Sequence, residues 1–263
     1  MKAFSNEFTF IKRLFNLSGE PRTEQEIRTK NQNSVFFQHG LNRNAGLTKL
    51  NELLLKLYGK EYDETTNMWS EHLVLFASIS ESDIKISKIL EIGTFDGETT
   101  KILSYLFPES DILTIDLPRD ALGEIEMYKY KTGNPEFESL RNLNLTQSRN
   151  VLFKEMNSLQ LLKSSAKFDL IWIDGDHSYP IAAIDIANSL RLLTPKGMAI
   201  CDDVYMDSSK KNTPGRSNCS YETLCCLSEA KLISYSLIRK RVGVNFNAAN
   251  SNEKFLGLIK KLT

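Results

Sequence analysis

Three aspartates and one histidine follow two apolar segments in the second half of this sequence. The segment FDLIWID ends in Asp174 and leads on to His177, and the segment GMAICDD ends in Asp202 and Asp203. If the two segments are neighbouring parallel strands, their ends lie about 5 Å apart. Carboxylates that close repel one another, and a divalent cation is the usual way to neutralise them. The pattern therefore favours a metal site at the three aspartates, and an all-oxygen ligand set favours Mg²⁺, with Mn²⁺ and Ca²⁺ as alternatives.

The histidine of this group is a candidate general base. His177 follows Asp174 by three residues, and an unperturbed histidine pKa of about 6.5 suits proton removal at neutral pH. A metal ligand and a helix cap remain open as alternatives for this residue. The aspartates have an alternative too, since acidic residues at strand ends are often helix N-caps or solvated loop residues.

A loop with two glycines earlier in the chain has the pattern of a nucleoside site. The stretch Lys88–Thr99, KILEIGTFDGET, is an apolar strand that runs into Gly93 and Gly97. Glycines let the chain turn sharply and let a ligand approach the backbone, and the following helix would direct its free N–H groups at that ligand. The next apolar run ends in Asp116, whose carboxylate suits a ribose diol. Because the loop is G-x-x-x-G and not G-x-G-x-x-G, a nucleoside without phosphates fits better than a nicotinamide dinucleotide.

The elements that must position these residues are short apolar strands that alternate with helices from Lys88 onward. We expect strands near 88–92, 111–116, 150–155, 169–174, 198–202, 232–239 and 242–247, and a helix over 98–106. Pro195 and Gly197 are expected to form the turn before the fifth strand. This alternation is typical of a parallel sheet with helices on its faces, and such sheets bind ligands beyond the carboxyl ends of their strands.

Residues 1–86 have a different texture and are expected to form an N-terminal helical extension, followed by the ligand-binding domain over residues 87–263. Leu47–Leu57 and Thr66–Ser78 have the apolar spacing of helices. An apolar face over residues 4–15 is expected to pack on the core or on a second subunit, which makes a homodimer an expectation. The polar stretch Ser18–Asn33 is expected to be a flexible separator, and the loop Met206–Ser220 a mobile cover.

The bulk composition argues against several classes of function. At 263 residues the chain can form one α/β core with an extension but not a second full domain. Thirty-three basic residues balance thirty-three acidic ones, so we expect neither nucleic acid nor membrane as a partner, and the basic run Arg239–Arg241 is expected to be a solvated strand end. Four cysteines lack the spacing of a metal finger, and no apolar run reaches about eighteen residues. We therefore expect a cytoplasmic protein with free thiols.

The segments EIGTFDG, TIDLP, FKEMNS, FDLIWIDGDHSY and LLTPKGMAICDDV, in this order, resemble those of the class I S-adenosylmethionine-dependent methyltransferases. More closely, they are similar to the metal-dependent O-methyltransferases related to catechol and macrolide-sugar O-methyltransferases. The resemblance covers about Met68 to Asn247. It implies a Rossmann-like, doubly wound α/β fold with a seven-stranded, mostly parallel sheet in the order 3-2-1-4-5-7-6, preceded by the helical extension.

The resemblance also implies a role for each motif. The cofactor-binding positions of the family correspond here to Glu91, Gly93, Thr94 and Gly97 for the methionine part, Asp116 for the ribose, Asn157 and Ser158 for the adenine, and Asp174. The metal-binding positions correspond to Asp174, Asp202 and Asp203, although Asn is frequent at the last of these. A lysine serves as the base in catechol-type members, and His177 stands at that position here, as in the sugar-modifying relatives.

The implied function is transfer of a methyl group from S-adenosylmethionine to a hydroxyl oxygen of a small molecule, assisted by Mg²⁺ or another divalent cation. Three alternatives remain at this point. They are an NAD-dependent oxidoreductase, a metal-independent methyltransferase in which the aspartates cap helices, and a non-catalytic protein that binds the nucleoside. No motif identifies the acceptor.

Overall fold

The computed structural model describes residues 22–66, 68–118, 134–148, 150–206, 217–243 and 254–262. The expected apolar face over residues 4–15 and the greater part of the expected cover over 206–220 lie outside these ranges. Among the described helices, none combines the length and the apolar character needed to cross a bilayer.

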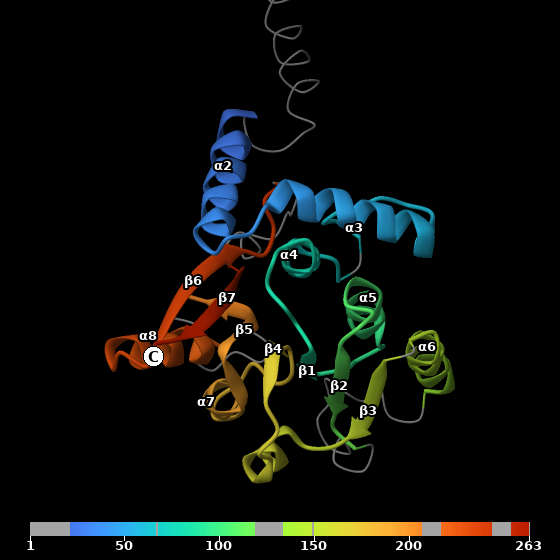
Figure 1. Ribbon diagram of the computed structural model, residues 1–263, viewed down its shortest axis with the longest axis vertical. Helices are drawn as coiled ribbons and strands as arrows, with labels where there is room; N and C mark the ends of the chain where they lie inside the picture. The colour runs from blue at the N-terminus through green and yellow to red at the C-terminus, as the bar shows by residue number, and fades with distance from the viewer. Residues whose placement is uncertain are drawn as a thin grey trace, which may run out of the picture.

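Seven strands form one mixed sheet at the centre of the fold (Figure 1). Their order is β3-β2-β1-β4-β5-β7-β6, as expected; β1 to β5 run parallel, and β7 is antiparallel to both of its neighbours. The strands are β1 Lys88–Ile92, β2 Asp111–Asp116, β3 Val151–Glu155, β4 Phe168–Ile173, β5 Leu193–Tyr205, β6 Ile233–Arg239 and β7 Lys254–Lys261. The order reverses between β1 and β4, so the carboxyl ends of these two strands flank the crevice where an open α/β sheet binds its ligand.

Helices cover both faces of this Rossmann-like sheet. One face carries α3, α4 and α5 and the other carries α7 and α8, while α2 lies against the edge strand β6 (Figure 1). The helices are α2 Arg22–Gln38, α3 Arg43–Tyr58, α4 Glu71–Ser80, α5 Glu98–Leu106, α6 Pro135–Thr146, α7 Ile181–Leu192 and α8 Cys219–Glu229, with the 3-10 helix η3 Ser158–Lys163. The expected helices over 47–57 and 98–106 are confirmed by α3 and α5.

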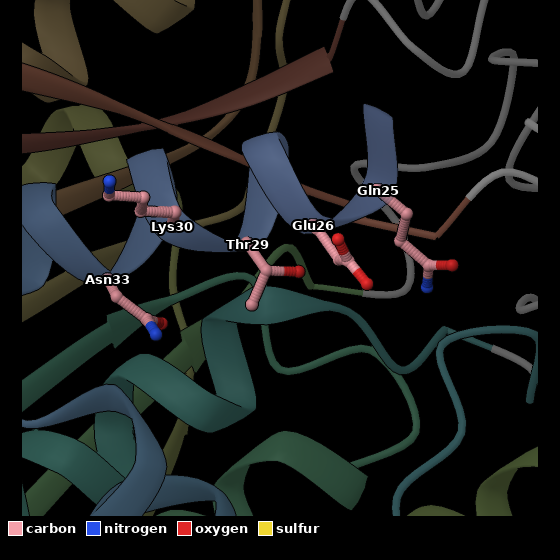
Figure 2. Close-up of a pocket in the computed structure, with 5 residues that line it drawn as sticks. All are labelled: Gln25, Glu26, Thr29, Lys30 and Asn33. Atoms are coloured by element: carbon pink, nitrogen blue, oxygen red, sulfur yellow. The ribbon is translucent and has the colours of Figure 1, made fainter. Parts of the chain in front are cut away.

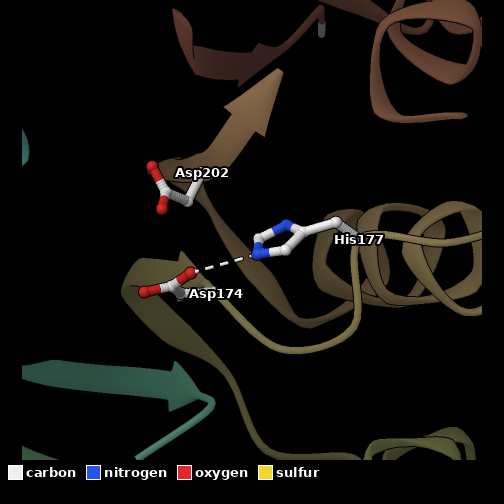
Figure 3. Close-up of side chains that lie close together, drawn as sticks. All are labelled: Asp174, His177 and Asp202. Atoms are coloured by element: carbon white, nitrogen blue, oxygen red, sulfur yellow. Dashed lines mark ion pairs between the residues drawn. The ribbon is translucent and has the colours of Figure 1, made fainter. Parts of the chain in front are cut away.

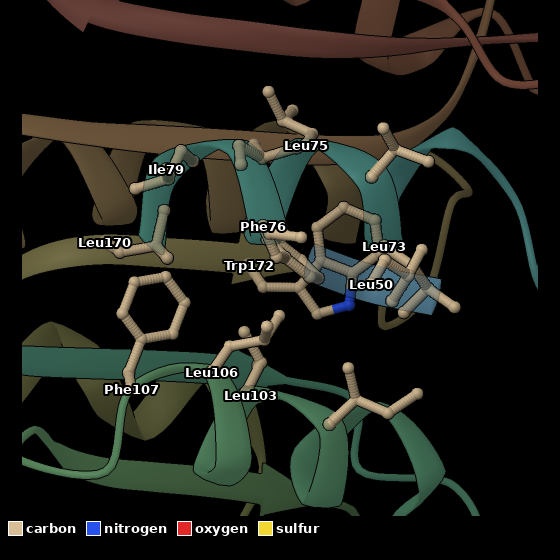
Figure 4. Packing of buried hydrophobic residues seen from close by; sticks show 14 of the residues in the cluster. Leu50, Leu73, Leu75, Phe76, Ile79, Leu103, Leu106, Phe107, Leu170 and Trp172 are labelled. Carbon is tan, nitrogen blue, oxygen red and sulfur yellow. The ribbon is translucent and has the colours of Figure 1, made fainter. Parts of the chain in front are cut away.

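The helix α4 lies at the centre of the larger hydrophobic cluster. Nine of its ten residues are buried, among them the polar residues Glu71, His72 and Ser78. Its Phe76 meets Trp172 of β4 edge to face, with ring centroids 5.2 Å apart (Figure 4). The imidazole of His72, one turn earlier on α4, stacks on the same indole with centroids 5.2 Å apart. The N-terminal helices therefore share one core with the sheet.

Two strands differ from the expected ones. The seventh strand is Lys254–Lys261. Of the expected 242–247 strand, residues 242 and 243 lie outside any strand, and residues 244–247 lie outside the described ranges. The backbone N–H of Val242 instead donates to Oε2 of Glu64 at 2.8 Å, so it is not free for a strand partner. The fifth strand is longer than expected and contains Pro195 and Gly197, at a point where its pairing with β4 changes register. These two residues therefore form a bulge inside β5 and not a turn before it.

Two helical segments also differ from the expectations. The polar stretch 18–33 is helical from residue 22 onward, in α2. Its Gln32 side chain donates to the carbonyl of Arg239 at 2.9 Å and accepts from the N–H of the same residue at 3.1 Å, which fixes the helix to the sheet edge. The helix expected over 66–78 begins only at Glu71, because Ser70 is extended and the N–H of Glu71 donates to the carbonyl of Lys240 at 2.9 Å.

Candidate active site

Asp174 and Asp202 lie side by side because β4 and β5 are parallel neighbours. Asp174 directly follows β4, and its N–H donates to the carbonyl of Ile92 at 2.8 Å. The Nε2 atom of His177 is 3.4 Å from Oδ1 of Asp174. Asp174, His177 and Asp202 each offer one ligand atom, and these three atoms lie within 4.8 Å of one another (Figure 3). The structure thus brings together three of the four residues of the predicted metal and base group.

The fourth residue, Asp203, contacts two lysines. Its φ of 48° is a left-handed value that non-glycine residues seldom adopt. Its Oδ1 lies 2.6 Å from Nζ of Lys240, and its Oδ2 lies 2.6 Å from Nζ of Lys254. Burial raises the pKa of Asp203, but the positive charge of Lys240 and the other nearby cations outweigh it and hold this pKa well below its usual value. The part of Asp203 as a metal ligand stays a prediction.

Lys240 is a buried member of this group, whereas the run Arg239–Arg241 was expected to be solvated. Its side chain is only 7% exposed, and its Nζ is 2.5 Å from Oδ2 of Asp202 as well as 2.6 Å from Asp203. Burial lowers the pKa of Lys240, but the two aspartates raise it further than burial lowers it, so the amine is charged. Because 38 residues separate Lys240 from Asp202, no local pattern in the sequence marks this contact.

Asp202 keeps one carboxylate oxygen without a partner. Its side chain is 6% exposed, and among the described residues its Oδ1 has no hydrogen-bond partner. Burial of an unpaired carboxylate oxygen is costly, and a bound cation removes that cost. The orphaned oxygen beside Asp174 therefore fits a divalent cation, which Asp174 and Asp202 would hold.

The pKa values of Asp174 and His177 are both shifted upward. Burial, reinforced by the charge of Asp202, raises the pKa of Asp174 to about 7, although His177 opposes this change. Burial lowers the pKa of His177, but its contact with Asp174 and the charges of the other aspartates raise it more, so the net shift is upward. Asp174 therefore favours the protonated imidazole, which suits a group that accepts a proton during the reaction.

The predicted cofactor loop turns at two glycines with positive φ. Gly93 has φ of 100° and Gly97, which begins α5, has φ of 76°. A Cβ on Gly93 would lie 2.1 Å from the carbonyl oxygen of Asp174, whereas a Cβ on Gly97 would lie 3.4 Å from its nearest neighbour. Gly93 is thus required by the close approach of the backbone at Asp174 as well as by the turn. The loop and the acidic group are consequently parts of one rim.

Glu91 and Thr94 belong to a buried polar network under α5. Glu91 is fully buried, and its Oε2 accepts hydrogen bonds from the hydroxyls of Thr100 and Thr114, the latter at 2.6 Å. The hydroxyl of Thr94 is 2.6 Å from that of Thr114. Burial raises the pKa of Glu91 to about 8 even though both hydroxyls lower it. The network braces the turn from within, and contact of these two residues with the cofactor stays a prediction.

The predicted ribose and adenine positions are neighbours. Asp116 ends β2, and its carboxylate accepts from the N–H groups of Phe95 and Leu117, both at 2.9 Å. The carbonyl of Asp116 accepts from the N–H of Met156 at 2.7 Å, immediately before Asn157. Asn157 caps η3, and Ser158 is the first residue of that helix. The ends of β2 and β3 therefore hold all three residues at the edge of the crevice beside the glycine loop.

A separate pocket lies along one face of α2 (Figure 2). It is lined by Gln25, Glu26, Thr29, Lys30 and Asn33. None of the predicted site residues lines it. Its only opposite charges, Glu26 and Lys30, are four residues apart on the helix, an arrangement typical of a solvated helix surface.

Comparison with known proteins supports a methyltransferase. A family model described as a methyltransferase domain matches residues 90–204, a range from β1 to β5 that contains every predicted site residue. No curated protein matches the chain.

Solved structures share the fold at low sequence identity. A candidate O-methyltransferase from Klebsiella pneumoniae is 17% identical with a TM-score of 0.52, over 81% of this chain and 96% of its own. The O-methyltransferase TomG from Streptomyces achromogenes, solved with S-adenosylmethionine, is 15% identical with a TM-score of 0.51, over 89% and 98%. The methyltransferase PaMTH1 from Podospora anserina, bound to S-adenosylhomocysteine, is 14% identical with a TM-score of 0.51, over 100% and 97%. Residues 90–204 thus match a methyltransferase domain, and the chain as a whole shares the fold of solved methyltransferases.

Proposed function

We propose that this domain transfers a methyl group to a hydroxyl oxygen of a small molecule, with a divalent cation at Asp174 and Asp202 and with His177 as the base. The observation that carries the proposal is the convergence of these three side chains within 4.8 Å at the ends of β4 and β5. Two carboxylates beside a proton acceptor suit removal of a hydroxyl proton. The similarity in fold to TomG, an O-methyltransferase involved in tomaymycin synthesis, agrees with this choice of acceptor.

The donor set at the rim fits a divalent cation. Asp202 contributes the orphaned, buried oxygen, and Asp174 contributes a carboxylate that is 32% exposed on the other side of the group. Oxygen ligands of this kind suit Mg²⁺ or Mn²⁺. A bound cation would polarise the acceptor hydroxyl and lower its pKa.

His177 is positioned for proton transfer by Asp174. Its Nε2 faces the carboxylate at 3.4 Å, which fixes the orientation of the ring. When the ring takes the hydroxyl proton, the adjacent negative charge stabilises the imidazolium that forms.

The loop after β1 and the ends of β2 and β3 form the proposed site for S-adenosylmethionine, which supplies the methyl group. The turn at Gly93 and Gly97 would hold the methionine part, and Asp116 would accept the ribose hydroxyls. A carboxylate accepts several hydrogen bonds at once, so the two backbone donors on Asp116 do not preclude this role. Asn157 and Ser158 would frame the adenine.

The proposal is tested by methyl transfer from labelled S-adenosylmethionine to a panel of catechols and vicinal sugar diols. We expect labelled ether products with Mg²⁺ and their loss in excess EDTA. Undiminished activity in EDTA would remove the cation from the proposal. Binding of S-adenosylhomocysteine without turnover on any acceptor would favour the non-catalytic alternative.

The base is tested by His177→Ala in the same assay. We expect kcat to fall about 100- to 10,000-fold, the usual contribution of a general base, with unchanged affinity for S-adenosylhomocysteine. His39→Ala is the matched control, because His39 bonds to Ser236 on β6 and has no place in the rim. Full turnover by His177→Ala would remove the base and leave the remainder of the proposal in place.

A further inference from the structure

The rim contains fixed positive charge of its own. The Nζ atom of Lys240 bridges Asp202 and Asp203 at 2.5 Å and 2.6 Å, and Nζ of Lys254 contacts the other oxygen of Asp203 at 2.6 Å. Both oxygens of Asp203 and one oxygen of Asp202 are therefore occupied by ammonium groups. Of the four carboxylate oxygens of Asp202 and Asp203, only Oδ1 of Asp202 has no hydrogen-bond partner among the described residues.

The backbone holds Lys240 in this position. Its carbonyl accepts from the N–H of Glu71 at the start of α4 at 2.9 Å, and its own N–H donates to the carbonyl of Lys254 at 3.0 Å. The residue is 5% exposed. Because both sides of its peptide are tied to neighbouring elements and its side chain is enclosed, the amine cannot move away into solvent.

We propose that Lys240 is the resident cation of this rim, and that it weakens the binding of a divalent cation by withholding Asp203 and one oxygen of Asp202. The proposal rests on the proposed function, because it concerns the same site. It assigns the divalent cation to Asp174 and the free oxygen of Asp202 alone. Lys240 then acts as a positioning residue that holds the Asp202 carboxylate through Oδ2 and leaves Oδ1 free.

The charge balance supports this assignment. Three carboxylates, those of Asp174, Asp202 and Asp203, face two ammonium groups, those of Lys240 and Lys254. A divalent cation at Asp202 must therefore bind close to a positive charge that contacts the same carboxylate. Like charges a few ångströms apart repel strongly in a partly buried site. Removal of the Lys240 charge should accordingly strengthen divalent binding.

The test is titration of the purified full-length protein with Mn²⁺, followed by the loss of the electron paramagnetic resonance signal of free Mn²⁺. We expect Lys240→Met, which keeps the aliphatic stem, to bind Mn²⁺ about tenfold or more tightly than the unaltered protein. Lys254→Met is the matched control, since Lys254 contacts Asp203 but not Asp202, and its affinity should change less than threefold. Adding Asp174→Asn to Lys240→Met should abolish the gain, which places the Mn²⁺ at this rim.

Thermal melting provides a second measurement if Lys240→Met folds poorly. Mn²⁺ should then raise the melting temperature of Lys240→Met more than that of the unaltered protein. Mn²⁺ affinity that is unchanged or weaker in Lys240→Met would overturn the inference about Lys240. If the unaltered protein still binds Mn²⁺ in that experiment, the proposed metal site is retained. Absence of Mn²⁺ binding by both proteins would overturn the inference and remove the cation from the proposed function as well.

Discussion

Two buried acidic groups at the rim are neutralised in opposite ways. Glu91, at the end of β1, has only threonine hydroxyls on its Oε2, and burial raises its pKa to about 8. Asp203, in β5, has an ammonium group on each oxygen, and its pKa lies well below the usual value. At neutral pH the first group is therefore mainly an uncharged acid, and the second is a carboxylate.

The comparison teaches that the partners supplied by the fold, and not depth of burial, decide the charge of each group. The donors to Glu91 are 9 and 23 residues away, on the adjoining helix and strand. The lysines on Asp203 are 37 and 51 residues away in sequence, and the pairing of β6 and β7 with the rest of the sheet brings them next to it. A neutral network thus supports the turn at Gly93, and an ionic network supports the rim at Asp202 and Asp203.

The largest expected effect is a difference in the free energy of unfolding between variants of Asp203 and of Glu91. Asp203→Asn removes the carboxylate that the buried Lys240 shares with the partly exposed Lys254, and loss of one partner from a buried ion pair costs about 3–5 kcal/mol. Glu91→Gln replaces a neutral acid by a neutral amide and should cost about 1 kcal/mol or less at pH 7. Urea unfolding of both variants at pH 7 measures the difference. Equal losses of unfolding free energy would contradict the contrast.

The next effect concerns Gly93, which lets the two networks lie side by side. Gly93→Ala combines a left-handed φ with a Cβ that would lie 2.1 Å from the carbonyl oxygen of Asp174. We expect a loss of about 2–5 kcal/mol in unfolding free energy, with weaker binding of S-adenosylhomocysteine in calorimetry. Gly40→Ala is the control, because Gly40 has φ of 74° but no atom within 4 Å of its Cβ position, so it should lose only about 1–2 kcal/mol. Similar losses in both variants would show that the approach of Asp174 is not constrained.

The fold was predictable where a pattern is local. The apolar runs before Gly93 and Asp116 predict β1 and β2 with the bounds that are observed. The strand over 254–261 was missed because its apolar run is flanked by lysines. The run over 242–247 was predicted as the seventh strand in its place. The helix α2 was missed because its sequence is polar, and its anchoring through Gln32 to β6 joins residues 207 positions apart.

The candidate site, like the fold, was predictable only where a local sequence pattern marks it. Asp174 and Asp202 each follow an apolar run, and parallel neighbouring strands bring the residues after such runs together, so their meeting could be anticipated. The contacts of Lys240 could not be anticipated, because a lysine between two arginines is usually solvated and its burial depends on contacts with residues distant in sequence, in β5 and at the start of α4. The neutral state of Glu91 was likewise hidden, since it depends on enclosure by α5.

A smaller effect is the pH dependence that Glu91 adds to stability. Its pKa is raised on folding from 4.5 to about 8, so the folded state binds more protons than the unfolded state within this window. Stability therefore falls as the pH rises through it, by at most about 1.4 kcal/mol per pH unit for a single group. Glu91→Gln should remove this part of the slope between pH 5 and 8 in urea unfolding. A slope identical to that of the unaltered protein would show that Glu91 is ionised in the fold.

The smallest effect concerns the hydroxyl donors that favour the ionised form of Glu91. Thr100→Val keeps the shape of the side chain and removes one hydrogen bond to Oε2, which should cost about 1 kcal/mol at neutral pH. Because this bond lowers the pKa of Glu91, its loss should move the pH-dependent decline in stability to higher pH. Thr48→Val is the control, since the Thr48 hydroxyl donates only to the carbonyl of Asn44 on the exposed side of α3. Combining Thr100→Val with Glu91→Gln should cancel the pH shift, because the shift acts through the carboxyl group of Glu91. If the shift persists, the neutral network contains more residues than these. The contrast with Asp203 then holds between two regions of the molecule and not between two single side chains.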